Sequence, residues 1–303
     1  MKISQWYLDD DDKRIAKNYS KREGDSDTID LRSGTLSGIL RAVLVFLLGV
    51  FIILTIWKFF AWYYNDYIGL YLLHFPTPEE SFVRLYEYFT DYRLVLGYTI
   101  YEHLESSLVR WMTAFALAAV AGLTLGTILG CSRTLYPIGM SPVNVIQMIP
   151  GMAWLPVAIL IFGLGDDAAI FIIFLISFVI ITLNVAGGIR RIPEVFIRAS
   201  DMMGADRLTK VFKVLLPFAA LDIISGLRQG MGSAWRVLIS AEMLVATGLG
   251  LGFAISALRG VLDYVGSFAC IVIIGVIGLL VDKVIFVNIE KYARHKLGMD
   301  QDV

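Results

Sequence analysis

The chain has 303 residues, of which 57% are hydrophobic and only 17% are charged, and its mean hydropathy is +0.70. A soluble domain of this length usually carries about 25% charged residues. The composition therefore excludes an ordinary water-soluble protein and predicts an outer surface that meets lipid. The net charge of −1 gives no electrostatic reason to expect nucleic acid as a partner.

The few cysteine and histidine residues predict neither a metal site nor a cofactor. Cys131 and Cys270 each lie in or at the end of an apolar run, where a cysteine is usually a small buried hydrophobic residue. A disulfide or a metal site would need partners that the sequence does not provide. His74, His103 and His295 are scattered along the chain and are interpreted as surface or interfacial residues.

The first 35 residues are polar and are expected to form a mobile tail. Asp9 to Asp12 are followed by several lysines and arginines, and the apolar stretch of a signal peptide is missing. Such a segment cannot bury enough apolar surface to offset the entropy lost on ordering.

Six stretches are predicted to span a membrane, because a helix needs about 20 mostly apolar residues to cross a bilayer. They run from about Ile39 to Trp62, Ser107 to Gly130, Ile138 to Phe162, Ala168 to Gly188, Ala219 to Val245 and Val265 to Val287. The sequence thus predicts an all-α membrane protein with about six transmembrane helices. Its expected parts are the tail 1–35, a first span with an outer segment at 36–101, a core at 102–290 and a second tail at 291–303.

Lysine and arginine residues are concentrated in alternate flanks of these spans, and such residues mark the cytoplasmic side. Eight of them precede or begin the first span, at residues 2–41, and six lie in the loop at 189–217. Lys291, Arg294 and Lys296 follow the last span, whereas the intervening flanks hold few basic residues. The N-terminus and the C-terminus are therefore both predicted to be cytoplasmic.

The longest outer segment, residues 63–104, is predicted to contain a short helix. Thr77 suits the capping position and Pro78 suits the first turn. Residues 81–92 would then form a helix that lies near the outer surface.

The predicted second span carries a small residue at every fourth position: Ala114, Ala118, Gly122, Gly126 and Gly130. Small residues let two helix backbones approach closely in lipid, where packing drives association. The row predicts a tight helix–helix contact, and apolar filler is the alternative.

The predicted third span contains Pro142, Pro150 and Pro156, each of which removes a backbone donor and kinks a helix. Irregular backbone at membrane depth is tolerated where protein covers it or where it lines a cavity. We therefore expect one wall of a translocation path on the side of this segment that carries Asn144, Gln147, Gly151 and Trp154.

The predicted fifth span supplies a second wall, because a polar and small stripe follows one helical face: Ser225, Gln229, Gly232, Arg236 and Ser240. A charge at membrane depth is costly unless it is paired or hydrated, and it marks a functional site by default. Glu242 lies near the outer end of the same helix. A structural ion pair that fixes the packing of the bundle is the alternative. The fourth span has a weaker stripe of Ser177, Asn184 and Gly188.

The loop at 189–217 is predicted to form two short amphipathic helices. Pro193 and Glu194 suit the first turn of the first helix, and Gly204 suits the left-handed position that closes it. Asp206 would cap the second helix, which Pro217 would end. The first apolar face would consist of Val195, Phe196, Ala199, Met202 and Met203. These helices could lie on the membrane surface or dock into a partner.

This loop resembles the conserved cytoplasmic loop of the permeases of binding-protein-dependent ABC importers. The family pattern is Glu-Ala-Ala, three residues, a glycine and, about a dozen residues later, Leu-Pro. Ala199, Gly204, Leu216 and Pro217 hold the corresponding places. The resemblance covers roughly residues 102–289, about two thirds of the chain.

The segments that flank the loop carry the same resemblance. His103 to Arg110 resembles the start of the permease core. Pro150 to Gly165 and Ala241 to Gly250 resemble the branch that handles nitrate, sulfonate, taurine or bicarbonate. The resemblance implies a type I ABC importer permease-like bundle, multi-pass, in the plasma (inner) membrane of a prokaryote.

The resemblance also implies partners. These are cytoplasmic ABC ATPase subunits, an extracytoplasmic substrate-binding protein, a second permease copy in a homodimer, and the lipid bilayer. The implied substrate is a small anion, to which Arg236 could offer a positive charge. ATP hydrolysis is expected on the partner, so the chain itself is not expected to be an enzyme. The contact with the ATPase would involve Glu194, Arg198, Ala199, Ser200, Asp201, Gly204, Ala205, Leu216 and Pro217.

The loop departs from the family pattern in its charges. Arg198 replaces the family's glutamate, Ser200 replaces the second alanine, and Asp201 occupies a place that is often basic. The two charges look exchanged at positions i and i+3, where a pair can bridge along a helix. We expect the loop to keep its helix and to face an ATPase groove of altered charge.

Two other functions compete with this interpretation. An intramembrane enzyme would need convergent acid–base or metal groups, but Arg236 and Glu242 lie on different helical faces. A channel or a secondary transporter would work without an ATPase and would leave the amphipathic loop idle. The sequence has no Gly-x-x-x-x-Gly-Lys-Ser/Thr nucleotide motif, no His-Glu-x-x-His metal motif and no Gly-x-Ser-x-Gly turn.

Overall fold

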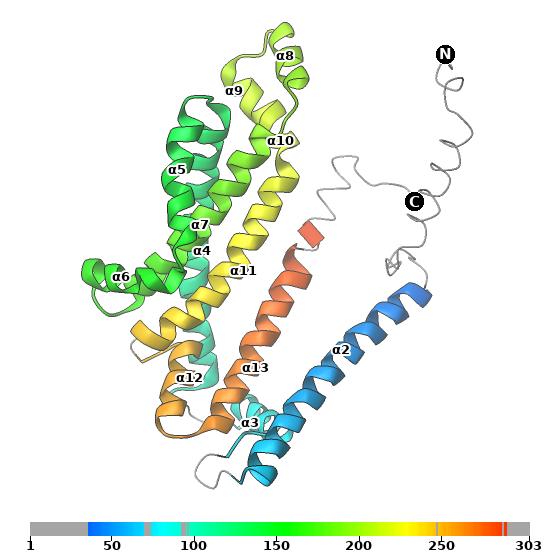
Figure 1. Ribbon diagram of the computed structural model, residues 1–303, viewed down its shortest axis with the longest axis vertical. Helices are drawn as coiled ribbons and strands as arrows, with labels where there is room; N and C mark the ends of the chain where they lie inside the picture. The colour runs from blue at the N-terminus through cyan, green and yellow to red at the C-terminus, as the bar shows by residue number, and fades with distance from the viewer. Residues whose placement is uncertain are drawn as a thin grey trace. The chain divides into compact units, whose positions relative to one another are not determined.

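The computed structural model describes residues 36–69, 74–91, 95, 97–246, 248–286 and 288–289. Helices dominate these ranges, in which an isolated bridge between Val95 and Tyr98 is the only sheet-like pairing (Figure 1). The predicted all-α class is therefore confirmed. The chain divides into two units, residues 1–60 and 61–303, which are described separately. The predicted tails 1–35 and 291–303, with His295, lie outside the described residues.

Helix α2 (Leu36–Trp62) makes up the described part of the first unit and matches the first predicted span. The stretch Val43–Tyr67 has a mean hydropathy of 2.6, and no residue of its most apolar window is buried. A helix that is apolar all round is stable only inside a large core or in lipid. This apolar window of α2 therefore has the surface of a helix that lipid surrounds.

Helix α7 (Asp166–Arg190) lies at the centre of the second unit, packed between α4 (Ile100–Cys131) and α11 (Ala220–Val245). The predicted small-residue row of α4 is buried in this contact. A Cβ added to Gly126 would lie 2.7 Å from Val185 Cβ and 3.0 Å from the carbonyl oxygen of Thr182. The predicted tight helix–helix contact is therefore confirmed, and α7 is the partner.

A neighbouring face of α7 meets a second pair of glycines, on α11. A Cβ added to Gly226 would lie 2.6 Å from Asn184 Cβ, and one added to Gly230 would lie 2.9 Å from Ile181 Cγ1. Both glycines are buried. Backbone-to-backbone contact on two sides thus fixes the position of α7.

The third predicted span is two helices rather than one kinked helix. Helix α5 (Leu135–Met148) and the segment Gly151–Phe162, which contains a 3₁₀ turn and α6 (Leu155–Phe162), meet at an angle of 100°. Pro150 is extended at the break, with φ −54° and ψ 136°. The expectation of one continuous side that carries both Asn144 and Trp154 is therefore wrong, because the helix direction changes between them.

The second unit is completed by helices near the end of the chain. The segment before the sixth predicted span contains a helix that was not predicted, α12 (Leu251–Gly260). The sixth span is α13 (Tyr264–Leu280), which continues as a π-helical turn, Val281–Phe286. Cys270 in α13 is buried as predicted, whereas Cys131 is exposed because it is the last residue of α4.

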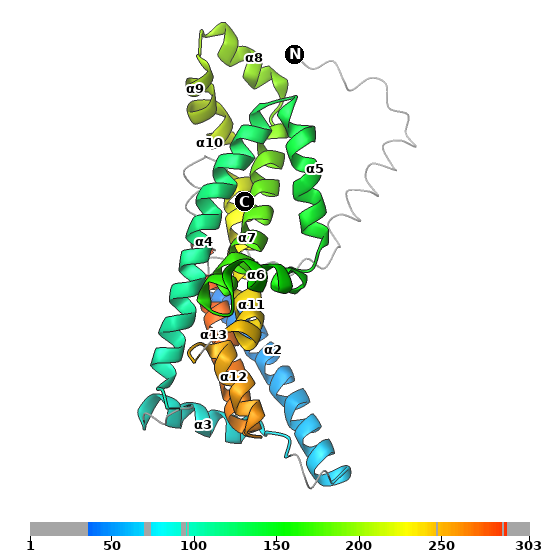
Figure 2. The same ribbon diagram turned by 90° about the vertical axis from the view of Figure 1, so that its left-hand side faces the viewer.

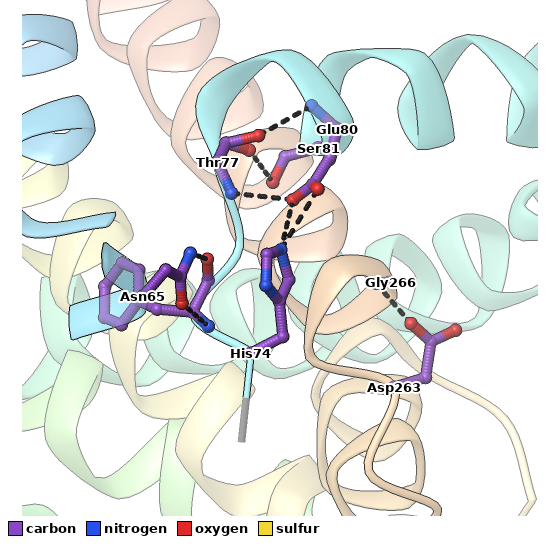
Figure 3. A network of polar contacts seen from close by, with 8 residues as sticks. Asn65, His74, Thr77, Glu80, Ser81, Asp263 and Gly266 are labelled. Carbon is purple, nitrogen blue, oxygen red and sulfur yellow. Dashed lines mark hydrogen bonds and ion pairs between the residues drawn. The ribbon is translucent and has the colours of Figure 1, made fainter. Parts of the chain in front are cut away.

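The predicted outer helix is α3 (Pro78–Thr90), and its first turn is capped as the sequence indicates. Thr77 accepts a hydrogen bond from the Glu80 amide at 3.3 Å, and the Glu80 carboxylate accepts one from the Thr77 amide at 2.9 Å (Figure 3). His74 binds the same carboxylate at 3.0 Å. Helix α3 packs on α13, and Arg84 Nη1 reaches Asp263 Oδ2 at 2.5 Å.

Four helices of the described chain are long and apolar enough to cross a membrane, or up to five if the bent pair counts as one span. The predicted fifth span, α11, is not among them. At 26 residues it would extend about 39 Å, which exceeds the thickness of the hydrocarbon core. Helix α11 is not apolar enough to count as a spanning helix, because it carries Asp222, Arg228, Arg236 and Glu242.

A glycine inside the contact between α4 and α7 and a glycine outside it should respond differently to substitution by alanine. Gly126→Ala is expected to lower the free energy of unfolding by about 1–3 kcal/mol, because the added methyl group overpacks the interface. Gly275→Ala on α13 should leave stability unchanged or raise it, because nothing lies within 4 Å of its added Cβ. Thermal unfolding of both variants in detergent measures the difference, and equal Tm values would contradict the assigned contact.

Candidate functional site

A polar cavity of about 430 Å³ opens between α5, α7 and α11 and the π-helical turn that follows α13. Four residues predicted for the translocation path line it: Gln147, Asn184, Gln229 and Arg236. They come from three predicted spans that are separate in the sequence. The cavity therefore brings together residues from both predicted walls and from the weaker stripe of the fourth span.

Charge in this cavity is partly neutralised. Arg228 Nε lies 2.8 Å from Asp282 Oδ1, so this arginine and this carboxylate offset one another. Arg236 is exposed, and its Nη2 donates to Ser233 Oγ at 2.9 Å. Within the described part of the chain, no carboxylate lies within salt-bridge distance of Arg236. One positive charge thus remains available to a ligand.

A second cavity of about 400 Å³ shares a wall with the first. Arg228, Gly232, Arg236 and Asp282 line both. The second cavity adds the edges of Trp111 and Trp235, whose rings meet at 4.9 Å between centroids. Polar and aromatic surfaces are therefore continuous around Arg236.

The other predicted path residues lie elsewhere. Asn144 is exposed on α5, and Trp154 lies in the 3₁₀ turn with its indole nitrogen buried. Ser177 is fully buried and donates to the Gly230 carbonyl at 3.3 Å, which ties α7 to α11. Ser240 donates to the Arg236 carbonyl at 3.3 Å. None of these four side chains lines the polar cavity.

Glu242 has no exposed surface. Its contacts favour a structural ion pair over a residue of the translocation path. Its Oε1 lies 2.7 Å from Arg110 Nη1, and both of its carboxylate oxygens lie 2.8 Å from Ser107 Oγ. The Gly252 amide donates to Oε2 at 2.9 Å. On its other side, Arg110 Nε reaches Asp166 Oδ1 at 2.8 Å. This cluster joins α4, α7, α11 and α12.

His103 extends the same cluster, so its interpretation as a surface residue is wrong. It is fully buried, with Nδ1 3.1 Å from the Gly250 amide nitrogen and Nε2 3.1 Å from the Val95 carbonyl oxygen. His103, Ser107 and Arg110 follow i, i+4, i+7 spacing in an apolar helix, a signal that could have identified this face.

The loop at 189–217 forms the predicted pair of helices, at the opposite end of the second unit from α3 (Figures 1 and 2). The first is α8 (Glu194–Met202), and Gly204 closes it with a φ of +72°. Asp206 caps α9 (Arg207–Lys210) by accepting from the Thr209 amide at 3.3 Å. The predicted caps and the retained helix are therefore confirmed.

Pro217 does not end the second helix as predicted. Helix α9 continues through a π-helical turn, Val211–Leu215, into α10 (Leu216–Phe218), and α11 begins at Ala220. A π turn pairs each carbonyl with a later amide than an α-helix does. The helical conformation can therefore continue past Pro217, which has no backbone N–H to donate.

The exchanged charges of the loop do not bridge each other. Arg198 Nη2 lies 2.7 Å from Glu194 Oε2, and Asp201 pairs with Lys210. Glu194 also accepts from Arg133 Nη2 at 2.5 Å, which connects α8 to the end of α4. The Arg198 hydrogen bond and the charge of Arg133 hold the pKa of the Glu194 carboxyl below its usual range.

The remaining predicted loop residues divide into packed and exposed groups. Ser200 is buried and donates to the Ile197 carbonyl at 2.6 Å, and the Ala205 amide donates to the Ser200 carbonyl at 3.1 Å. Ala199 and Leu216 are half-buried. The tip is apolar and exposed: Val195, Met202 and Met203 are 73%, 85% and 79% exposed. The tip therefore exposes several large apolar side chains close together.

Residues 118–291 match the family described as "Binding-protein-dependent transport system inner membrane component", which is more than half of the chain. The chain belongs to this family. It is a permease of an ABC importer and a multi-pass membrane protein, of the branch with relatives named for taurine, nitrate and bicarbonate transport.

Curated relatives agree with the family. A putative ABC transporter permease protein of Methanocaldococcus jannaschii is 32% identical over 238 residues, 78% of this chain and 86% of that protein. The taurine transport system permease protein of Escherichia coli is 30% identical over 210 residues, 69% and 76% of the two chains. The nitrate import permease protein of a Synechocystis strain is 32% identical over 181 residues, which cover 59% of this chain and 65% of that protein.

The fold also agrees with a solved importer. An inward-facing structure of the MetNI methionine ABC transporter aligns with a TM-score of 0.56 and 23% identity. The alignment covers 63% of this chain and 94% of that chain. At this identity the likeness supports the type I permease fold alone.

The Arg110–Glu242 pair predicts a large loss of stability for Glu242→Gln. Breaking a buried ion pair from one side typically costs about 3–5 kcal/mol, because the remaining charge stays buried. Glu105→Gln is the matched control, since Glu105 is exposed on α4 and should change stability by no more than about 0.5 kcal/mol. Unfolding in detergent measures the stability of both variants. A Glu242→Gln variant as stable as the wild type would rule out the structural role.

Proposed function

We propose that this permease forms half of the path for a small anion, such as nitrate, sulfonate, taurine or bicarbonate, and pairs with a second copy of itself. Cytoplasmic ATPase subunits supply energy through α8, and an extracytoplasmic binding protein delivers the substrate. The observation that carries the proposal is the cavity in which Gln147, Asn184, Gln229 and Arg236 converge from three predicted spans.

The charge of the cavity supports an anionic substrate. Arg228 and Asp282 offset one another, while Arg236 has the hydroxyl of Ser233 as its side-chain acceptor within the residues that the structure describes. A positive charge at membrane depth is costly unless water or a counter-ion meets it. A transported anion would supply that counter-charge. The names of the relatives point the same way, since they include nitrate import and bicarbonate transport.

The geometry of α8 supports its role as the ATPase contact. The helix presents Val195, Met202 and Met203 outward, and its other side is fixed to the bundle. The fixing contacts are the Arg133–Glu194 ion pair at 2.5 Å and the packing of Phe196 on Phe218 at 4.5 Å between ring centroids. A helix that is held in this way transmits a push from a docked partner to α4 and α11.

The side of the membrane follows from the distribution of basic residues. Arg133, Arg190, Arg207 and Lys210 lie around α8 and α9, and clusters of this kind mark the cytoplasmic side. The α8 end of the second unit would then face the cytoplasmic ATPase. With six spans, both termini would also be cytoplasmic.

Arg236→Gln is expected to reduce ATP-driven anion uptake about tenfold or more, because a lost charge-assisted hydrogen bond costs about 1.5–3 kcal/mol. The measurement is uptake of labelled taurine, nitrate and bicarbonate into proteoliposomes that contain the permease, its ATPase and its binding protein. Arg259→Gln, an exposed substitution at the end of α12, should retain wild-type uptake. Unchanged uptake of all three anions by Arg236→Gln would refute the anion path.

Met203→Glu is expected to abolish co-purification of the ATPase and ATP-driven uptake, because it places a charge on an apolar docking surface. Since Met203 is 79% exposed, the Tm of the permease should not change. Val261→Glu, 63% exposed beyond the end of α12, should retain the ATPase. A permease that transports without any bound ATPase would instead indicate a channel or a secondary transporter.

A further inference from the structure

A third cavity, of about 910 Å³, lies at the α8 end of the second unit. Its walls include the last residues of two helices, Cys131 of α4 and Arg190 of α7, together with residues of the loop helices α8 and α9. A site at the ends of spanning helices lies at the depth of lipid headgroups. None of the residues that line the polar cavity around Arg236 takes part in it.

The cavity carries an excess of positive charge. Arg133, Arg190, Arg207 and Lys210 line it, and Glu194 is its one lining carboxylate. Arg133 is paired with Glu194 at 2.5 Å, and Lys210 is paired with Asp201.

Two of these cations are left uncompensated. In the part of the chain that the structure describes, neither Arg190 nor Arg207 has a carboxylate within salt-bridge distance. The Arg190 guanidinium lies over the Tyr136 ring at 4.9 Å from the centroid, a contact that helps to hold it in place. Two guanidinium groups therefore remain without an anionic partner.

The rest of the lining is apolar. Two guanidinium groups beside an apolar wall limit the class of ligand that fits. The apolar wall consists of Ile189, Ile192, Ile197, Leu208, Val211 and Leu215. A soluble anion would leave this wall uncovered, whereas an amphiphile satisfies both surfaces. Guanidinium groups bind phosphate oxygens in a bidentate manner. Basic pockets between helices on the cytoplasmic side are typical sites for acidic lipid headgroups.

We propose that this cavity binds an anionic phospholipid of the leaflet at the α8 end, with its phosphate on Arg190 and Arg207 and its acyl chains along the apolar wall. The apolar tip proposed for the ATPase lies outside the cavity, because Val195, Met202 and Met203 do not line it, and of the residues expected to contact the ATPase Glu194 alone is in its lining. A bound lipid would fill the space between α8 and the ends of α4 and α7. It would thus stiffen the connection through which α8 acts on the bundle.

The test is native mass spectrometry of the full chain in detergent, after exchange with equal amounts of phosphatidylglycerol and phosphatidylcholine. The wild type should retain phosphatidylglycerol preferentially. The double variant Arg190→Gln/Arg207→Gln should retain about 30-fold less of it, because each of the two basic residues contributes about 1 kcal/mol near the surface. Both side chains are exposed, so the variant should keep the Tm of the wild type.

Lys213→Gln/Arg259→Gln is the matched control, since it removes the same charge from exposed residues outside the cavity. It should retain phosphatidylglycerol like the wild type, and Arg190→Lys/Arg207→Lys should retain more of it than the glutamine variant, because lysine keeps the charge but loses the bidentate geometry. Equal losses in the cavity and control variants would overturn the proposal. A rise in Tm with inorganic phosphate that matches the rise with phosphatidylglycerol, without retained lipid, would also overturn it. The readout needs neither the ATPase nor a transported substrate, so it is independent of the proposed transport function.

Discussion

The close approach of α7 to two glycine-lined helices is the contact on which the remaining geometry depends. Gly126 of α4 and Gly226 of α11 leave no room for a side chain against α7. In lipid, where apolar side chains gain little from leaving the solvent, such packing is a main source of helix association. With α7 fixed on both sides, Asn184 faces the polar cavity and Arg190 reaches the cavity near α8.

Charge on α11 is compatible with a membrane because most of it is paired across helices. The pairs are Asp222 with Arg191 at 3.0 Å, Arg228 with Asp282 at 2.8 Å and Glu242 with Arg110 at 2.7 Å. Each pair also connects α11 to another segment, so the same interactions that offset desolvation hold the bundle together. Arg236 differs from the other three, since a hydroxyl is its neighbour. Among the long helices of the unit, α11 is therefore the one whose Arg236 has no carboxylate partner among the described residues.

Local sequence signals predicted local structure well. Thr77, Gly204 and Asp206 act as the sequence indicates, because capping depends on a few neighbouring residues. The small-residue row of α4 also predicted a contact, although its partner had to come from the structure.

Features that depend on distant or competing residues were not predictable from local signals. Arg110 and Glu242 are 132 positions apart, and nothing local indicates that they meet. The prolines of the third predicted span indicated a break, but its 100° bend depends on how α5 and α6 pack. Arg198 pairs with Glu194 rather than with Asp201, because more than one carboxylate lies near it on the same helix. Most of the predicted path and loop roles remain proposals.

Contacts at opposite ends of the second unit determine how many times its chain runs between those ends. The last residues of α4 and α7 share one cavity wall, whereas Arg110, early in α4, reaches Asp166 at the start of α7. The bent pair α5–α6 must therefore carry the chain back as a single traverse. Together with α4, α7, α11 and α13 it makes five traverses, an odd number. An odd number of traverses places the beginning of α4 and the end of α13 at opposite ends of the second unit.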